Sequence, residues 1–235
     1  IQWRRTMRYF AILSVLPIFL ACSCPQVETL KKGKKEILDQ IYKDRLIEVA
    51  ARVYARELTS GTGGDISVRV PGTERIIVKA TGTCLGDLDY EKLSTINLKG
   101  EVIGGNPAPS HEADIHAAIY SMRDTVGAIM HMHAPYSTAW ATAGKLIPAV
   151  TQQSVKPLET AGIVPYYRVG SPELIQAVVE AYRNPGTTVV MMENHGVFVV
   201  GRDLYELLYT AEVVENAARI AWLCKALGEP KRFEF

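Results

Sequence analysis

Three histidines are the residues whose type and spacing could support metal chemistry. His131 and His133 follow the apolar run 126–130, and side chains two residues apart on a strand point to the same face. His195 follows a second apolar run, 188–192, in the turn of a predicted hairpin. Three neutral imidazoles suit zinc in a catalytic site, where one coordination position stays open for water or substrate. We therefore expect these side chains to hold a divalent metal.

A carboxylate lies upstream of the histidines. Glu112 follows Ser110, a good helix N-cap, so it is predicted in the first helical turn, ionised and favoured by the helix dipole. His116 lies about one turn further and can share a face with Glu112. We interpret His116 as a supporting partner of Glu112 and not as a ligand. In the alternative interpretation, a His-x-His pair in a strand consists of ordinary half-buried residues.

The elements that must position these residues alternate along the chain. Strands are predicted from apolar runs, and helices from caps, from Pro at the first helical position and from apolar stripes. Helices are expected over about 37–53, from 110, from about 137, from 171 to 184 with Ser171 as cap, and from 203 to 228 with a capping box at Asp203 and Glu206. Strands are expected over 66–70, 76–80, 126–130, 188–192 and 197–200.

Five motifs in this order resemble the class II aldolase/adducin family, over about residues 37–227. They are Gly-Thr-Gly-Gly-Asp-Ile-Ser-Val-Arg (61–69), Ala-Thr-Gly (80–82), Pro-Ser-His-Glu (109–112), His-Met-His (131–133) and Asn-His-Gly (194–196). By that resemblance, His131, His133 and His195 correspond to the metal ligands and Glu112 to the catalytic acid/base. The resemblance implies a three-layer α/β/α fold around a central, mostly antiparallel sheet. It also implies Zn²⁺, or Mn²⁺ or Co²⁺, and a homotetramer with the site at a subunit interface.

The activity implied by the resemblance is that of a metal-dependent lyase. It would cleave a carbon–carbon bond by a retro-aldol reaction in a small sugar-like hydroxy-ketone, with or without phosphate, through a metal-stabilised enediolate. A decarboxylase or dehydratase on the same scaffold is the alternative, because the site and not the fold sets the reaction. A second alternative is a non-catalytic, adducin-like scaffold domain, which would hold no metal.

The resemblance also predicts a pocket for a substrate anion. Its candidate residues are Gly63, Gly64, Asp65, Thr81, Gly82, Ser110 and His111. Asp65 and His111 depart from the family pattern, which has an asparagine and a serine there. A carboxylate at Asp65 would repel a phosphate, and a protonated His111 could offset this. Gln152 stands where the aldolases place a proton-donating tyrosine, and an amide cannot act as an acid.

Composition indicates one large domain that acts on a small molecule. The 235 residues carry a formal net charge of +1 and are 48% hydrophobic, so nothing favours a nucleic-acid partner. Cys84 and Cys224 are isolated and suggest no disulfide framework. We interpret both as ordinary thiols.

The start of the chain differs from the rest. Basic residues at 4, 5 and 8 precede an apolar run, 9–21, and Cys22, as in a secretory or lipoprotein signal. It could be an export signal with Cys22 lipidated, a peripheral membrane anchor, or upstream sequence translated from a wrong start, which Ile1 in place of methionine favours. We expect a leader over residues 1–26, a catalytic domain over 27–235 and a cytoplasmic enzyme, with membrane contact only if the leader is real.

Overall fold

A computed structural model describes residues 25–228. The chain forms two compact units, Ile1–Gln40 and Ile41–Phe235, and helix α1 (Pro25–Ala55) contributes residues to both. Residues 1–24, which hold most of the expected leader, lie outside the described part. Among the described residues, no helix is long and apolar enough to cross a membrane.

One eight-stranded sheet organises the second unit, in the order β4-β3-β2-β1-β5-β8-β7-β6. Every neighbouring pair is antiparallel except β6 with β7, which confirms the expected mostly antiparallel sheet. The strands are β1 (Asp65–Arg69), β2 (Ile76–Lys79), β3 (Leu93–Ile96), β4 (Val102–Gly105), β5 (Ala128–Met132), β6 (Gly162–Val164), β7 (Val189–Met192) and β8 (Gly196–Gly201).

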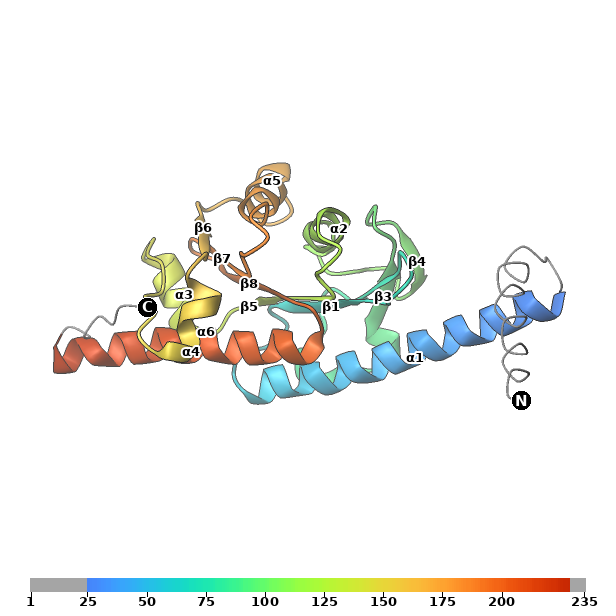
Figure 1. Ribbon diagram of the computed structural model, residues 1–235, viewed down its shortest axis with the longest axis horizontal. Helices are drawn as coiled ribbons and strands as arrows, with labels where there is room; N and C mark the ends of the chain where they lie inside the picture. The colour runs from blue at the N-terminus through green and yellow to red at the C-terminus, as the bar shows by residue number, and fades with distance from the viewer. Residues whose placement is uncertain (1–24, 229–235) are drawn as a thin grey trace, which may run out of the picture. The chain divides into compact units, whose positions relative to one another are not determined.

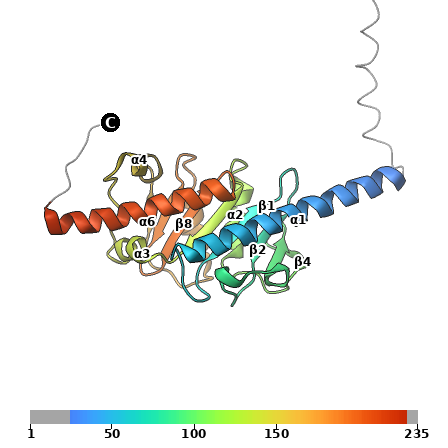
Figure 2. The same cartoon turned by 90° about the horizontal axis from the view of Figure 1, so that it is seen from below.

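Helices cover both faces of this sheet and make the three expected layers (Figure 1). Helices α2 (Ala113–Met122) and α5 (Pro172–Ala181) lie on one face. Helix α6 (Leu204–Leu227) and residues 41–55 of α1 lie on the other face, as the view from below shows (Figure 2). Helices α3 (Pro135–Thr142) and α4 (Gln152–Leu158) pack against α6, and two short 3-10 turns, η2 (Leu85–Asp87) and η3 (Tyr90–Lys92), precede β3.

Two helix starts follow directly from their capping residues. The Ser171 hydroxyl accepts a hydrogen bond from the Leu174 amide at 3.2 Å, and Pro172 takes the first helical position of α5. Asp203 accepts from the amide of Glu206 at 2.8 Å at the start of α6. The predicted capping box is half present, because the Glu206 carboxylate accepts from the amide of Arg202 and not from that of Asp203.

The core nearest the candidate site lies between the sheet and the layer of α2 and α5. Apolar side chains from both helices meet those of the central strands, and burial of such surface contributes about 25 cal/mol per Å². Its larger members are Ile115, Ile119, Tyr120, Leu174, Val178, Tyr182, Ile129 and Phe198. This packing fixes α2, and with it Glu112 and His116, against β1, β5 and β8.

Candidate metal centre

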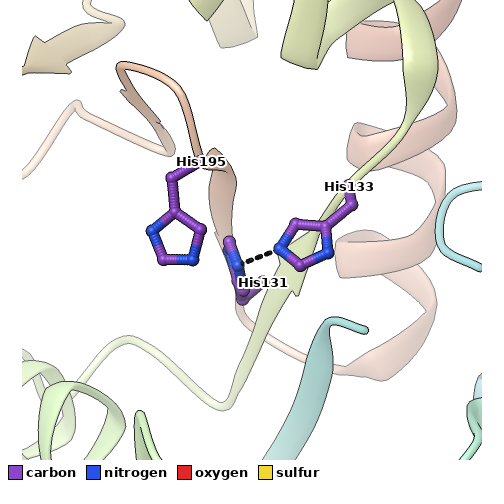
Figure 3. A group of neighbouring side chains, drawn as sticks. All are labelled: His131, His133 and His195. Atoms are coloured by element: carbon purple, nitrogen blue, oxygen red, sulfur yellow. Dashed lines mark hydrogen bonds between the residues drawn. The ribbon is translucent and has the colours of Figure 1, made fainter. Parts of the chain in front are cut away.

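Strand β5 and the turn between β7 and β8 bring the three histidines together (Figure 3). His131 lies in β5 opposite Phe198 of β8, His133 follows the last residue of β5, and His195 lies in the hairpin turn. One nitrogen atom of each ring lies within 4.8 Å of the others. The expected convergence of the three side chains is therefore present in the structure.

The imidazole rings are close-packed. Nε2 of His131 and Nε2 of His133 are 2.7 Å apart, and the ring centroids of His131 and His195 are 4.7 Å apart. The His131 ring stacks on Phe198 at 4.8 Å between centroids, and only 1% of His131 is exposed. The stack and the burial hold this side chain in one orientation.

The electrostatics of the cluster favour neutral imidazoles. Burial, followed by the neighbouring imidazole of His133, lowers the pKa of His195 to about 4. The same two causes lower the pKa of His131 well below its ordinary value, and burial lowers that of His133. Since a metal binds the unprotonated ring, all three side chains are in the form that ligates a cation near neutral pH.

The imidazole rings fit in this site only because two neighbouring residues are glycines. A Cβ atom at Gly63 would lie 2.7 Å from Nδ1 of His133, and one at Gly196 would lie 2.8 Å from Cε1 of His131. Nδ1 of His131, Nδ1 of His195 and Oε1 of Glu112 are buried without a hydrogen-bond partner within the described residues. Three imidazoles with an adjacent, unsatisfied carboxylate are a donor set that fits a divalent cation.

Glu112 lies against this cluster from the α2 side. Its Oε2 is 3.4 Å from Nε2 of His131, and its Oε1 is 3.8 Å from Nε2 of His195. The expected position in the first helical turn is wrong, because α2 begins at Ala113 and Glu112 is the N-cap residue with φ −106° and ψ 10°. Ser110 does not cap the helix, although its hydroxyl accepts from the Glu112 amide at 3.3 Å.

The surroundings of Glu112 act against its charge. Burial, followed by the charge of Asp65, raises the pKa of Glu112 well above its ordinary value. Only 5% of the residue is exposed. A buried carboxyl group beside a cation site can hold a proton and release it when the local charge changes.

His116 has a different partner from the one expected. Its Nε2 lies 2.9 Å from Oδ1 of Asp65, and its Nδ1 lies 2.6 Å from the hydroxyl oxygen of Ser67, which in turn is 2.9 Å from the hydroxyl of Tyr120. The contact between His116 and Glu112 is instead made by the backbone, since the amide of His116 donates to the carbonyl of Glu112 at 3.2 Å. His116 supports β1 instead.

Asp65 and Ser110, two of the expected anion-pocket residues, bond to each other. Oδ2 of Asp65 accepts a hydrogen bond from the hydroxyl of Ser110, and only 2% of Asp65 is exposed. Burial disfavours its charge, but His116, His131 and Ser110 outweigh burial and hold the pKa of Asp65 below its usual range. Asp65 is therefore a buried anion inside the protein and leaves little surface for a ligand.

The other expected pocket residues lie on neighbouring loops. The amide of Gly63 donates to the carbonyl of Ser60 at 3.1 Å, and that of Thr81 donates to the carbonyl of Ala108 at 2.9 Å, so neither N–H points to a ligand. Gly64 is half-buried with φ +65°. Gly82, with φ +70°, and His111 are both exposed. Fewer backbone amides are therefore free to bind an anion than the sequence predicted.

A buried cation nearby is not among the residues that the sequence predicts for the site. Lys79 ends β2 and is 3% exposed, and its ammonium group bonds to carbonyl oxygens of the glycine-rich loop before β1. A lysine at the end of the apolar run 76–78 was the available signal, but a strand end is also where a solvent-exposed lysine is common.

Fold and site together define a metal-dependent lyase of the aldolase type. Residues 44–222 match the family described as Class II Aldolase and Adducin N-terminal domain, and the chain belongs to this family. The family uses a divalent metal.

Individual relatives agree with this assignment. The chain is 33% identical over 189 residues to a 3-oxo-tetronate 4-phosphate decarboxylase of Haemophilus influenzae, covering 77% of this chain and 87% of the relative. It is 32% identical over 181 residues to an L-fuculose phosphate aldolase of Methanocaldococcus jannaschii, covering 77% and 96%. A solved L-fuculose 1-phosphate aldolase superposes with a TM-score of 0.74 at 27% identity, covering 82% of this chain and 90% of that chain.

Proposed function

We propose that this chain carries out the retro-aldol cleavage of a small, sugar-like hydroxy-ketone that carries a phosphate group. The observation that supports this proposal is the position of the Glu112 carboxylate, 3.4 Å and 3.8 Å from two of the three imidazole ligands. Both curated relatives described above are named for phosphorylated substrates, which favours phosphate as the substrate anion.

The roles of the residues follow from their chemistry. His131, His133 and His195 would hold the cation, which when bound polarises the substrate carbonyl and stabilises the negative charge that develops on it. Glu112 moves the proton. Because burial raises its pKa, the Glu112 carboxyl group can carry a proton, which it would deliver to the substrate carbon from which the aldehyde fragment leaves. The hydroxyl proton that the aldehyde fragment loses as the carbon–carbon bond breaks would pass to solvent water.

Decarboxylation of a 3-oxo acid is the second candidate, and two observations favour it. The decarboxylase of Haemophilus influenzae is 33% identical to this chain. Gln152, the exposed first residue of α4, offers no acidic proton at the position where the family's aldolases were expected to place a tyrosine. Loss of carbon dioxide needs no such donor, only an acceptor for electrons and the proton carried by Glu112.

The metal, the assembly and the compartment are part of the same proposal. We infer Zn²⁺ from the three imidazoles, with Mn²⁺ or Co²⁺ as substitutes. The resemblance to the family implies a homotetramer, and exposed apolar side chains on α6, among them Trp222 at 59% and Leu223 at 51% exposure, favour an interface there. Light scattering of the purified protein tests the tetramer. Fractionation of the full chain, with Cys22→Ser as control, tests the cytoplasmic location.

The decisive experiment combines metal analysis with a substrate panel. The purified chain is assayed for aldehyde and for carbon dioxide released from short phosphorylated ketoses and 3-oxo acids, and from their unphosphorylated counterparts. We expect His131→Ala to lose the metal. We expect Glu112→Gln to keep the metal and lose about 10²- to 10⁴-fold in kcat.

Glu173→Gln, an exposed carboxylate at the start of α5, is the matched control and should behave as the unmodified chain. Full activity of Glu112→Gln would refute its assigned role. Carbon dioxide without aldehyde would replace the first candidate by the second, and a preference for unphosphorylated substrates would refute the choice of phosphate.

A further inference from the structure

His116 is a buried polar side chain in helix α2 that neither holds the cation nor moves a proton in the proposed reaction. Solvent reaches none of it, and its two ring nitrogens face different partners. Nε2 contacts Oδ1 of Asp65 at 2.9 Å, and Nδ1 lies 2.6 Å from the hydroxyl oxygen of Ser67. Neither Nε2 nor this oxygen of Asp65 has a hydrogen-bond partner elsewhere in the described residues. Each of the two buried atoms therefore depends on the other for its compensation.

One route connects His116 to Glu112 through Asp65. The other carboxylate oxygen of Asp65, Oδ2, accepts from the hydroxyl of Ser110, and that hydroxyl oxygen accepts from the amide of Glu112 at 3.3 Å. The backbone closes the route, because the amide of His116 donates to the carbonyl of Glu112 at 3.2 Å. The N–H and the C=O of Glu112 are thus both held by groups that belong to His116 or that are linked to it.

A second route connects His116 to His131 through an aromatic ring. The ring of Phe198 meets that of His116 edge-on, with centroids 5.6 Å apart, and it stacks on that of His131, with centroids 4.8 Å apart. Asp65 adds a backbone connection, since it lies opposite His131 in the ladder between β1 and β5. A displacement of the His116 ring would therefore reach both the carboxyl group and the imidazole cluster.

We propose that His116 is a positioning residue, which sets the distance between the Glu112 carboxyl group and the His131 imidazole. It does so by holding Asp65 on one side of its ring and Phe198 on the other. The distance that it sets is 3.4 Å between Oε2 and Nε2. Groups that support a metal site from behind commonly change metal affinity or activity by about 10- to 100-fold when they are replaced. The effect on turnover rests on the proposed function, whereas the effects on the backbone and on metal affinity do not.

The test compares two amide side chains that reach different partners of the His116 ring. The amide nitrogen in His116→Gln can take the place of the ring Nε2 and keeps an N–H for Asp65, whereas the shorter side chain in His116→Asn reaches only Ser67. In His116→Asn, we expect hydrogen exchange at the Glu112 amide to rise and the affinity for Co²⁺ alone to fall, each by about tenfold. His116→Gln should lie closer to the unmodified chain in both measurements.

Tyr120→Phe is the matched control. The Tyr120 hydroxyl lies 2.9 Å from that of Ser67, at the end of the same buried chain that points away from Asp65, and the substitution keeps the ring. It removes one buried hydrogen bond, so it tests whether a loss of stability alone produces the effects. This variant should change neither the exchange at the Glu112 amide nor the Co²⁺ affinity. If His116→Asn does not fold, Ser110→Ala, which interrupts the first route, is measured in its place and should raise the same exchange.

Turnover gives a third measurement for any substrate that the unmodified chain cleaves. At saturating metal, His116→Asn should lower kcat by about tenfold and leave KM nearly unchanged, because the cation still binds the substrate while the proton is misplaced. A rise in KM with an unchanged kcat would contradict a role in positioning the Glu112 carboxyl group.

The other outcomes are decided without turnover. Exchange and Co²⁺ affinity of His116→Asn within about twofold of the unmodified chain would overturn the proposal, since a supporting group has a larger effect. Equal losses in His116→Asn and His116→Gln would refute the route through Asp65. Equal losses in Tyr120→Phe would show a general loosening of the core and refute positioning by His116. A failure of the proposed reaction on every substrate would leave these measurements separately interpretable.

Discussion

The side chains of Asp65 and His116 meet 2.9 Å apart between β1 and α2, where solvent reaches 2% of the first residue and none of the second. His116 also contacts the hydroxyl of Ser67, and Asp65 contacts that of Ser110. This buried polar network lies immediately behind His131, the backbone neighbour of Asp65 across β1 and β5. It ties the strand to the helix that presents Glu112.

Asp65→Asn should destabilise the protein. The substitution removes a charge whose pKa is held below its usual range by His116, and a buried polar network that loses one charged member costs about 1–3 kcal/mol. Urea unfolding measures the change. Asp114→Asn, at an exposed position in the first turn of α2, is the matched control and should stay within about 0.5 kcal/mol of the unmodified chain. Equal stability of the two variants would contradict the importance of the network.

Gly196→Ala should damage the metal site. The added Cβ would lie 2.5 Å from the carbonyl of Met132, 2.7 Å from Cδ2 of His133 and 2.8 Å from Cε1 of His131, so backbone and ligands would have to move apart. We expect a loss of about 1–3 kcal/mol in stability and a weaker affinity for Zn²⁺, measured by chelator competition. Gly104→Ala, whose Cβ would meet only Thr95 at 3.9 Å, should bind Zn²⁺ normally.

Glu215→Ala should loosen the start of α3. The Glu215 carboxylate in α6 accepts from the amides of Tyr136 at 2.9 Å and Ser137 at 2.8 Å, which fixes the helix that begins two residues after His133. Loss of a negative group at a helix N-terminus costs about 1 kcal/mol. Thermal unfolding measures this cost, and Glu215→Gln, which keeps an acceptor oxygen, should lose less. The interaction is unimportant if the alanine variant is as stable as the glutamine variant.

The metal-free protein should lose stability in acid because of His195. Burial lowers the pKa of this imidazole from 6.5 to about 4, so the unfolded chain binds the proton more tightly. This contribution to the free energy of unfolding is fully present above pH 6.5 and decreases as the pH falls through 6.5 towards 4. The difference between the unmodified chain and His195→Gln isolates the effect, because Glu112, whose pKa is raised, acts in the opposite sense. Urea titrations measure the free energies of unfolding of the two proteins at pH 7 and at pH 5. The same difference between the proteins at both pH values would contradict the prediction.

The parts of the fold and site that sequence predicted correctly depend on local signals. The alternation of His131 and His133 and the turn at Asn194, where φ is +53°, predict from short segments alone that the three imidazoles converge. The starts of α5 and α6 follow from single capping residues. Local patterns are informative because a strand or a cap is decided within a few residues.

The features that sequence missed depend on contacts between distant segments. The partner of His116 is set by how α2 packs on β1, and the burial of Lys79 by where the glycine-rich loop folds back. Strand β4 is an exposed edge that ends in two glycines, and β6 has three residues, so neither carries the alternation that predicts a strand. Glu112 was expected inside the helix, but it is the N-cap residue, immediately before the helix. No local pattern could determine this difference of a single residue.

The three imidazoles come from the end of β5 and from the hairpin turn between β7 and β8, two segments far apart in the chain that are joined through the β5–β8 ladder. A cation bound there would act as a removable cross-link at the end of these central strands. Because a ligand that binds only the folded state stabilises it by mass action, the supply of the cation would set the resistance of the protein to proteolysis as well as its activity. A shortage of the cation would then reduce both the amount of the enzyme and its turnover.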